Sequence, residues 1–283
     1  MNTTFSLHLL RAFLAVVDTG SFTAAARALH STQSTVSQQV LRLEETASQV
    51  LLDRSRRGVR PTEAGEQLLG YARRMLMLND EAAAALSGAS VRPAMRLGLP
   101  EDFASMRVTP LLSRFMRSHG GMKLEVTSGL SRDLQRAYDT GELDLVMVKQ
   151  KPGATVGVMS WPEPLCWLDS ADHPAFEMDP LPLAAFPPNG LYRADMISAL
   201  DAIGRRWRLA YTSSSLASIQ SAVADGLGVS LLPARTALPG HRVLTPDSGL
   251  PKAGMMEIAI HHRADAADHI RQLAALLAEA VEA

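Results

Sequence analysis

A run of hydrogen-bonding side chains opens one of the predicted helices, directly after the turn at residues 30–32. Glutamine can pair with the edge of an adenine through two hydrogen bonds, and hydroxyl groups can donate or accept. Most exposed helices also carry a polar, solvated face, so this run alone leaves base readout and a solvated face equally open. The side chains concerned are Gln33, Ser34, Thr35, Ser37 and Gln38.

Arginines concentrate on the segment that follows this helix. Alternating residues predict a small hairpin with strands at 50–52 and 59–60 and a basic tip at 54–58. Guanidinium groups that neutralise phosphates supply most of the nonspecific affinity of DNA-binding proteins. A polar helix beside such a hairpin favours DNA binding over the solvated face. The arginines are Arg54, Arg56, Arg57 and Arg60.

Three further polar clusters follow predicted strands at the starts of helices. Helix N-termini present unpaired N–H groups and the positive end of the dipole, which suits them to hold a small ligand. Helix capping is the commoner role for hydroxyl groups there, and it remains an alternative. Two carboxylates in the first cluster would repel an anion, so we expect a neutral or cationic ligand. The clusters are Pro100, Glu101 and Asp102; Ser128 and Gly129; and Thr212, Ser213, Ser214 and Ser215.

The patterns that would indicate catalysis are weak. His261 and His262 are adjacent in a predicted strand, so their side chains point to opposite faces and do not readily share one metal ion. Cys166 stands in an apolar strand, which predicts a buried, inert thiol. The sequence has no Gly-x-Ser-x-Gly motif at residues 213–215, no Walker loop and no dinucleotide-binding glycine motif. We expect no catalytic residue, metal or cofactor.

Two other classes of protein remain as alternatives. An enzyme with a DNA-binding appendage would be supported by ligand turnover, and an architectural DNA protein by site-independent, ligand-free DNA binding.

Helical periodicity predicts the elements that hold the DNA-binding residues. Helices are expected at residues 7–19 and 21–29, followed by a third with Val36, Val40 and Leu43 on one face, which together make a helix-turn-helix. A fourth helix begins after Pro61 and runs to about residue 86. Its apolar positions recur at alternating spacings of four and three, which favours pairing with a second copy of the chain over packing on its own domain.

A cluster of helix breakers at residues 88–93 marks a domain boundary. Beyond it, alternating strands and helices predict a parallel sheet with crossover connections. Strands are expected at 95–99, 123–127, 143–148, 165–168, 191–192, 209–211, 229–232 and 257–261. Helices are expected at 108–117, 131–139, 196–203, 216–224 and 267–280.

The composition is that of a folded protein. The 283 residues suggest about two domains, and 47% of them are hydrophobic. A net charge of −1 excludes a wholly basic nucleic-acid binder but allows a local basic surface. One cysteine, no secretory leader pattern and no apolar run of about 18 residues indicate a cytoplasmic protein without a membrane span.

The ordered segments FLAVVDTGSFTAAA at 13–26 and LHSTQSTVSQQVLRLE at 29–44 resemble the winged helix-turn-helix of bacterial LysR-type transcriptional regulators. The likeness continues through Leu51, Arg54, residues 57–59 and residues 62–65. The segments GELDL at 141–145 and AVADGLGVSLLP at 222–233 are similar to the effector domains of that family, so the resemblance covers nearly the whole chain.

The resemblance implies an α+β and α/β multidomain fold. A winged helix-turn-helix at 1–62 and a dimerising linker helix at 63–90 would precede a two-lobed, periplasmic-binding-protein-like effector domain at 91–283. One lobe would hold 93–161 and 264–283, and the other 162–263. Double-stranded DNA, a small-molecule effector, RNA polymerase and further copies in a homodimer or homotetramer would be the partners. The expected DNA-contacting set is Ser31, Thr32, Gln33, Ser34, Thr35, Ser37, Gln38, Arg42, Arg54, Arg56, Arg57 and Arg60.

The chain departs from the family pattern near the wing. Ala47 and Ser48 stand where the family usually has Leu-Gly, Leu52 replaces a phenylalanine, and Pro61 replaces a leucine. These changes bear on the angle of the wing and not on its existence.

Overall fold

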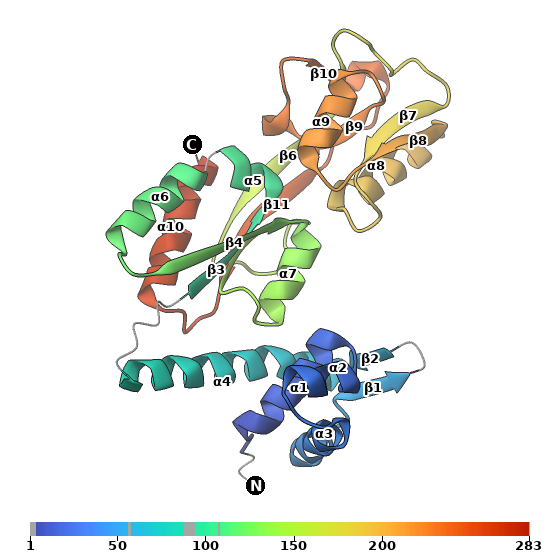
Figure 1. Cartoon of the computed structure of the whole chain (residues 1–283). Helices are drawn as coiled ribbons and strands as arrows, with labels where there is room; N and C mark the ends of the chain where they lie inside the picture. Colours follow the sequence, from blue (N-terminus) through green and yellow to red (C-terminus); the bar gives the residue numbers. More distant parts are fainter. Residues whose placement is uncertain (1–3, 56–57, 88–93, 107, 283) are drawn as a thin grey trace. The chain divides into compact units, whose positions relative to one another are not determined.

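The computed structural model describes residues 4–55, 58–87, 94–106 and 108–282 (Figure 1). The chain folds as two compact units, an N-terminal unit and a larger C-terminal unit, and each is described here by itself. Within the described residues, no helix is long and apolar enough to cross a membrane.

Three helices pack around one core in the N-terminal unit, together with Leu68, Leu69 and Ala72 of the helix that follows the wing. The core gathers side chains such as Leu10, Phe13, Val36 and Val40, all fully buried. Helix α1 ends at Gly20, whose φ of 64° is the left-handed conformation that glycine adopts at least cost. The predicted helix-turn-helix is confirmed. The helices are α1 (Leu7–Thr19), α2 (Phe22–Ala28) and α3 (Gln33–Ala47).

The predicted wing is also confirmed, with its first strand later in the chain than expected. Strands β1 (Leu52–Ser55) and β2 (Gly58–Pro61) pair in antiparallel register. Leu51 and Leu52 are buried in the core of this unit, so the start of β1 and the residue before it anchor the hairpin. The tip residues 56 and 57 lie outside the described part of the chain.

The fourth helix is α4 (Glu63–Ser87), in agreement with the expected linker helix. Its N-terminus is capped by Thr62, whose Oγ1 accepts a hydrogen bond from the backbone N–H of Gly65 at 3.1 Å. The first turn also carries Glu63 and Glu66, which complement the positive end of the helix dipole.

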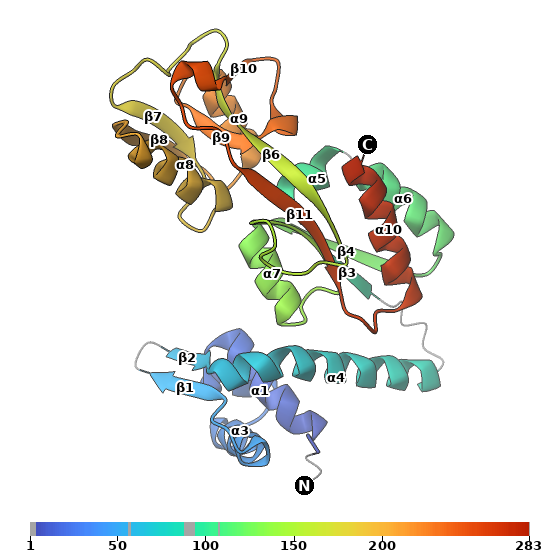
Figure 2. The ribbon, with the colours of Figure 1, turned by 180° about the vertical axis from the view of Figure 1, so that it is seen from behind.

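A sheet of seven strands runs through the described part of the C-terminal unit, in the order β10-β6-β11-β5-β3-β4, with β9 paired to β6. The pairs β3–β4 and β3–β5 are parallel, as predicted. In the first lobe, helices α6 and α10 cover one face of the sheet, and α7 lies on the other face (Figures 1 and 2). The elements of this lobe are β3 (Ala94–Pro100), α5 (Glu101–Met106), α6 (Val108–Ser118), β4 (Lys123–Gly129), α7 (Ser131–Asp139), β5 (Leu145–Gln150) and α10 (Asp268–Glu282).

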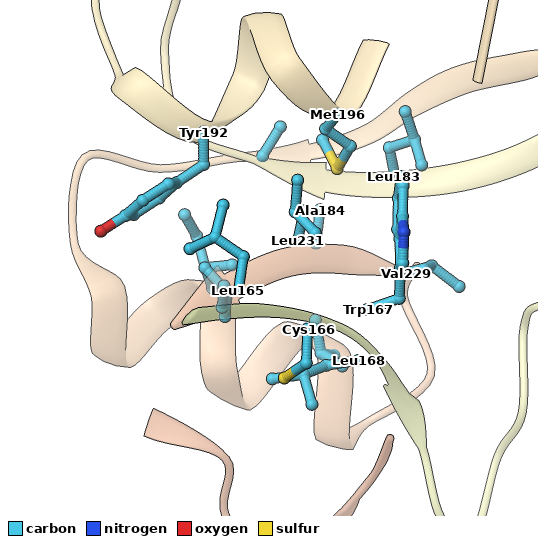
Figure 3. Close-up of a cluster of buried hydrophobic side chains, with 14 of the residues drawn as sticks. Leu165, Cys166, Trp167, Leu168, Leu183, Ala184, Tyr192, Met196, Val229 and Leu231 are labelled. Carbon is cyan, nitrogen blue, oxygen red and sulfur yellow. The ribbon is translucent and has the colours of Figure 1, made fainter. Parts of the chain in front are cut away.

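Two antiparallel strands, β6 (Met159–Ser170) and β11 (Met255–His262), connect the lobes. The second lobe packs its helices and strands around an apolar cluster that includes Trp167, Leu183 and Met196 (Figure 3). Its elements are β7 (Leu181–Ala185), α8 (Leu191–Ala202), β8 (Trp207–Thr212), α9 (Leu216–Ala224), β9 (Ser230–Pro233), a 3-10 turn at Ala234–Thr236, β10 (His241–Leu244) and a second 3-10 turn at Pro246–Ser248.

Three sequence-based expectations for this unit need correction. Residues 191–192 were expected in a strand, but they open α8, where Tyr192 packs into the apolar cluster of the second lobe. Strands β7 and β10 were not predicted. The expected boundary at residue 263 assigned β11 to the second lobe, yet Ile258 and Ile260 lie in the core of the first, because β11 pairs along β5.

Candidate DNA interface and effector cleft

The start of α3 presents the residues predicted to meet DNA. Ser31, Thr32, Gln33, Ser34, Thr35, Gln38 and Arg42 are exposed, and Ser37 is half-buried. The opposite face of α3 buries Val36, Val40 and Leu43, which fixes the rotation of the helix on its core. The polar face is therefore held outward by packing.

Some hydroxyl groups at this end are already engaged. Thr32 is the N-cap, and its Oγ1 accepts from the backbone N–H of Thr35 at 3.2 Å. The same oxygen lies 3.0 Å from the hydroxyl of Ser34 and 2.7 Å from that of Thr35. Gln33 and Gln38 carry longer side chains and extend the hydrogen-bonding surface beyond this cap.

The wing is tied to α3 by Glu44. Its Oε1 accepts hydrogen bonds from the backbone N–H groups of Leu51 and Leu52 at 2.9 and 3.1 Å. Its other oxygen lies 3.9 Å from Arg54, whose guanidinium stacks 4.8 Å from the centre of the Phe22 ring. Arg54 thus has structural contacts of its own, while Arg60 is exposed on β2. Arg56 and Arg57 lie outside the described residues.

The second candidate site is a cavity between the two lobes of the C-terminal unit. Its volume of about 50 Å³ holds only a few water molecules, since one needs roughly 10–15 Å³. Of the expected effector residues, Pro100, Glu101, Asp102, Gly129 and Ser214 line the cavity. Ser128, Thr212, Ser213 and Ser215 do not contribute to its lining. Ser215 instead caps α9 by accepting from the backbone N–H of Ser218 at 3.4 Å.

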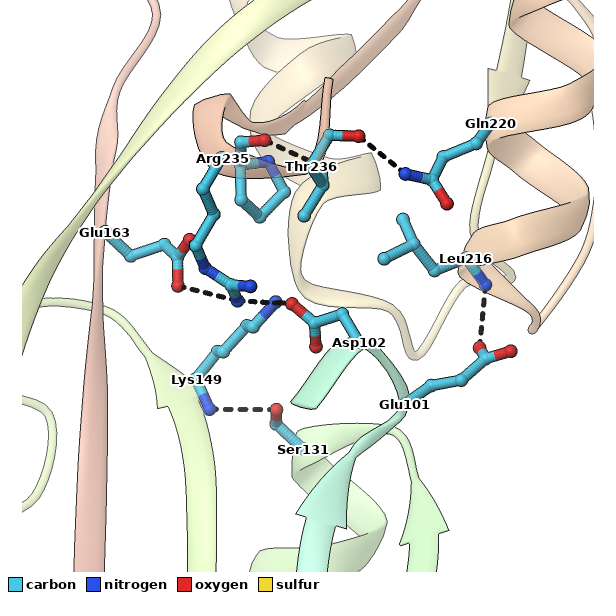
Figure 4. A network of polar contacts seen from close by, with 10 residues as sticks. Glu101, Asp102, Ser131, Lys149, Glu163, Leu216, Gln220, Arg235 and Thr236 are labelled. Atoms are coloured by element: carbon cyan, nitrogen blue, oxygen red, sulfur yellow. Dashed lines mark hydrogen bonds and ion pairs between the residues drawn. The ribbon is translucent and has the colours of Figure 1, made fainter. Parts of the chain in front are cut away.

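Glu101 reaches from the first lobe to the second. Its Oε1 accepts a hydrogen bond from the Ser215 hydroxyl at 2.8 Å, and its Oε2 accepts from the backbone N–H of Leu216 at 2.7 Å. Glu101 begins α5, whereas Ser215 and Leu216 begin α9. The carboxylate therefore complements the N-terminus of α9 on the opposite lobe (Figure 4).

Asp102 belongs to a buried network of charged groups (Figure 4). Its Oδ2 accepts from Lys149 Nζ at 2.5 Å and from Arg235 of the second lobe. Arg235 also donates through Nε to Glu163 Oε1 at 2.8 Å. The side chains of Asp102, Lys149 and Glu163 are 7%, 6% and 1% exposed. The two carboxylates of this network thus face cations.

Burial and charge act against each other here. Burial works to raise the pKa of Asp102, but Lys149 and Arg235 outweigh it and hold that pKa below its ordinary value. Burial lowers the pKa of Lys149 despite the opposing effect of Asp102. Burial, helped by the carboxylates of Asp102 and Glu163, raises the pKa of the Tyr192 phenol well above its ordinary value, so that hydroxyl stays protonated.

From the sequence, Glu101 and Asp102 were expected to repel an anionic ligand in the cleft. Glu101 and Asp102 do lie at a helix start beside the cleft, but both are engaged with groups of the other lobe. Sequence reasoning missed Lys149, Glu163, Tyr192 and Arg235. A lysine at the end of the apolar run 145–148 was the one signal available for the first of them.

The residues considered for catalysis show no shared site in the described ranges. Cys166 is buried among apolar side chains, and burial raises the pKa of its thiol. No group of three or more His, Cys, Asp or Glu side chains there could hold a metal ion.

Two family profiles match successive parts of the chain. The profile described as "Bacterial regulatory helix-turn-helix protein, lysR family" matches residues 7–66. The profile described as "LysR substrate binding domain" matches residues 88–282.

Two curated relatives cover most of the chain. The HTH-type transcriptional regulator PecT of Dickeya dadantii is 33% identical over 246 residues, which span 87% of this chain and 78% of PecT. The HTH-type transcriptional regulator DgdR of Burkholderia cepacia is 32% identical over 280 residues, 96% of this chain and 95% of DgdR. Both relatives are transcriptional regulators.

Solved structures share the fold at lower identity. ArgP from Mycobacterium tuberculosis superposes with a TM-score of 0.65 at 21% identity, covering 98% of this chain and 97% of ArgP. A full-length OxyR from Pseudomonas aeruginosa gives 0.60 at 24% identity, with coverage of 99% and 96%.

Proposed function

This chain belongs to the LysR family of DNA-binding transcriptional regulators, and we propose that α3 and the wing read its operator while the inter-lobe cleft binds the effector. The observation that carries the DNA part is the exposed polar start of α3, held outward by Val36, Val40 and Leu43. A helix presented in this way can enter the major groove with its N-terminal side chains against base edges.

The base-reading residues are Gln33, Ser34, Ser37 and Gln38. Ser31, Thr32, Thr35 and Arg42 complete the surface around them. Thr32 also holds the helix start in place, so its replacement would lower stability as well as DNA affinity. The exposed Arg60, with Arg54 and the tip residues Arg56 and Arg57, meets phosphates.

The effector is a small molecule held between the lobes. The cavity places apolar side chains such as Leu130 and Phe186 beside the polar groups of Asp102, Lys149 and Tyr192, a mixture typical of small-molecule sites. Glu101 and Asp102 are already paired with groups of the second lobe or with Lys149, so their charges alone do not select the charge of the effector. Ser214, which lines the cavity, supports the polar end of the effector from the second lobe. A ligand that contacts both lobes in this cleft would couple its binding to the arrangement of the lobes.

The protein works as a homodimer or homotetramer through α4, acts on RNA polymerase at promoters, and functions in the cytoplasm where its DNA lies. Its role is regulatory and not catalytic. We propose this because its relatives are transcriptional regulators and the charged side chains that line the inter-lobe cavity are engaged with one another or with α9.

One experiment tests the proposed function as a whole. Full-length protein is used to select genomic DNA fragments, and a metabolite library is then screened by thermal shift. We expect one enriched sequence motif and at least one compound that both stabilises the protein and changes its affinity for that motif. Selection of fragments without a common motif would contradict operator reading, and turnover of a stabilising compound would contradict a purely regulatory role.

A further inference from the structure

We propose that Glu101 is a built-in ligand of the α9 N-terminus, and that its carboxylate holds the two lobes of the effector domain together when no effector is bound. This inference rests on the proposed effector cleft and adds how that cleft is kept closed. The finding behind it is the pair of hydrogen bonds, at 2.8 and 2.7 Å, from Ser215 Oγ and Leu216 N to the two oxygens of Glu101.

The α9 N-terminus is a favourable place for a carboxylate. The first N–H groups of a helix lack intrahelical partners, and the dipole places partial positive charge beside them. Hydrogen bonds to an ionised acceptor are roughly twice as strong as neutral ones. Glu101 supplies this acceptor from the other lobe, so the stabilisation is available only while the lobes are close.

A second connection acts beside the first. Nη2 of Arg235, in the second lobe, donates to Asp102 of the first lobe. The same Nη2 and Nε also donate to Glu163 on the strand β6 that joins the lobes. Opening the cleft would separate Asp102 from one of its two cations and expose Lys149 to water. Both connections therefore break in the same movement, which makes closure cooperative.

The same cavity is lined by a buried hydroxyl group that makes no hydrogen bond within the described residues. Tyr192 is buried, lines the cavity with Glu101 and Leu216, and its hydroxyl has no hydrogen-bond partner among the described residues. Because its pKa is raised, this hydroxyl is protonated and available as a donor. A carboxylate ligand could use this donor together with those of α9 only by displacing Glu101. Glu101 thereby determines which ligands open the cleft.

The alternative is that Glu101 only caps the N-terminus of α9. Its carboxylate would then stabilise the first turn of α9 and leave the rest of the cleft unaffected. The two roles differ at segments that include cavity-lining residues but make no hydrogen bond to Glu101, such as residues 128–131 in the first lobe and 186–192 in the second.

Hydrogen–deuterium exchange on the full-length protein separates the two. In Glu101→Ala, we expect exchange about tenfold faster or more in peptides covering 128–131, 186–192 and 216–219, the factor expected for losing hydrogen bonds to a charged group. Acetate should restore slow exchange in the α9 peptide by occupying the vacated donors, and acetamide at equal concentration should not. Glu125→Ala, which removes an exposed carboxylate from the first lobe, is the matched control and should leave all three peptides unchanged.

Faster exchange confined to 216–219 would overturn the proposal and leave a local cap. Absence of rescue by acetate would overturn the built-in-ligand role. The test does not depend on the proposed function, because it needs neither operator nor effector. If an effector is found but Glu101→Ala leaves exchange unchanged, the proposed role of Glu101 in holding the lobes together fails and the proposed function stands. If the variant opens as expected but no effector exists, the proposed function fails.

Discussion

The ammonium of Lys149 lies 2.5 Å from Oδ2 of Asp102, and both side chains are almost completely buried between the lobes. A buried ion pair gains little over an apolar pair of the same size, but removing one partner leaves an uncompensated charge in a poor solvent. Lys149 would then keep the attraction of Glu163 and the contacts of its ammonium with the Phe103 and Tyr192 rings, while Arg235 repels it. The pair is thus a requirement of the closed cleft more than a source of stability.

Replacing Asp102 by asparagine should lower the free energy of unfolding by about 3–5 kcal/mol, the usual cost of breaking a buried pair. Urea unfolding of the full-length protein, followed by tryptophan fluorescence, measures it. Asp133→Asn is the matched control, because Asp133 forms an exposed pair with Arg136 and should cost less than about 0.5 kcal/mol. Adding Lys149→Met to Asp102→Asn should recover part of the loss; equal stability of the single and double variants would mean that Lys149 relaxes to water.

The lowered pKa of Asp102 predicts a loss of stability in acid. The folded protein keeps this carboxylate charged to a lower pH than the unfolded chain does. Its contribution is therefore complete above the ordinary carboxyl pKa of about 4 and is lost as pH falls below that value toward the folded pKa. Between about pH 5 and pH 2.5, the free energy of unfolding should fall more steeply with falling pH in the wild type than in Asp102→Asn. Parallel pH profiles would mean that other carboxylates account for the acid sensitivity.

Lys149 acts in the opposite pH range. Its folded pKa is also lowered, so the folded protein releases this proton at a lower pH than the unfolded chain. The cost of burying the charged ammonium is consequently complete below the folded pKa, and it falls as pH rises from that value toward the ordinary lysine pKa of about 10.4.

Local patterns were sufficient where local interactions decide the structure. Helix α9 was predicted at residues 216–224, because Ser215 is a good N-cap and the apolar positions follow helical spacing. Strands β7 and β10 escaped prediction, since Leu181–Ala185 follows a proline and contains another, and His241–Leu244 is only half apolar. Both are strands because of their neighbours: β7 pairs with β8, and β10 pairs with β6.

The charged network shows the same limit more sharply. Asp102 lies 47 positions from Lys149 and 133 from Arg235 in the sequence. No periodicity connects residues so far apart, and only the meeting of two lobes makes them partners. The sequence could therefore place Glu101 and Asp102 at a helix start but could not show what their charges face.

Ser48 offers a test of local strain at the end of α3. Its φ of 51° lies in the left-handed region, where a residue with a Cβ is disfavoured. Ser48→Gly relieves this conformation and should raise the free energy of unfolding by up to about 1 kcal/mol. Thermal melts of the full-length protein measure the change, with Ser37→Gly inside the helix as a destabilising control. A lower melting temperature for Ser48→Gly would mean that the freedom of glycine in the unfolded chain outweighs the relieved strain.

Asn79 tests the proposed dimer through α4. Its side chain is exposed on the single chain and donates to Asp80 at 3.1 Å, at a position that falls in the predicted apolar seam. A polar residue in such a seam fixes register at a cost in stability. Asn79→Leu should therefore raise the thermal stability of the assembly and permit other registers or larger assemblies, measured by sedimentation. If stability and assembly state are both unchanged, Asn79 faces solvent and does not lie between two copies of α4.

The division of labour between α3 and the wing gives the last prediction. Gln33→Ala removes a side chain that we propose reaches base edges, and it should weaken operator binding by about 1–3 kcal/mol while leaving nonspecific DNA binding nearly intact. Arg60→Ala removes a proposed phosphate contact, so it should weaken binding to both kinds of DNA alike and lower the slope of log affinity against log salt by about one. Fluorescence anisotropy with the selected operator and a scrambled duplex, over a salt series, measures both. Gln67→Ala is the matched control, because Gln67 is an exposed glutamine on α4. Intact operator discrimination in Gln33→Ala would show that α3 docks with a different face toward the groove.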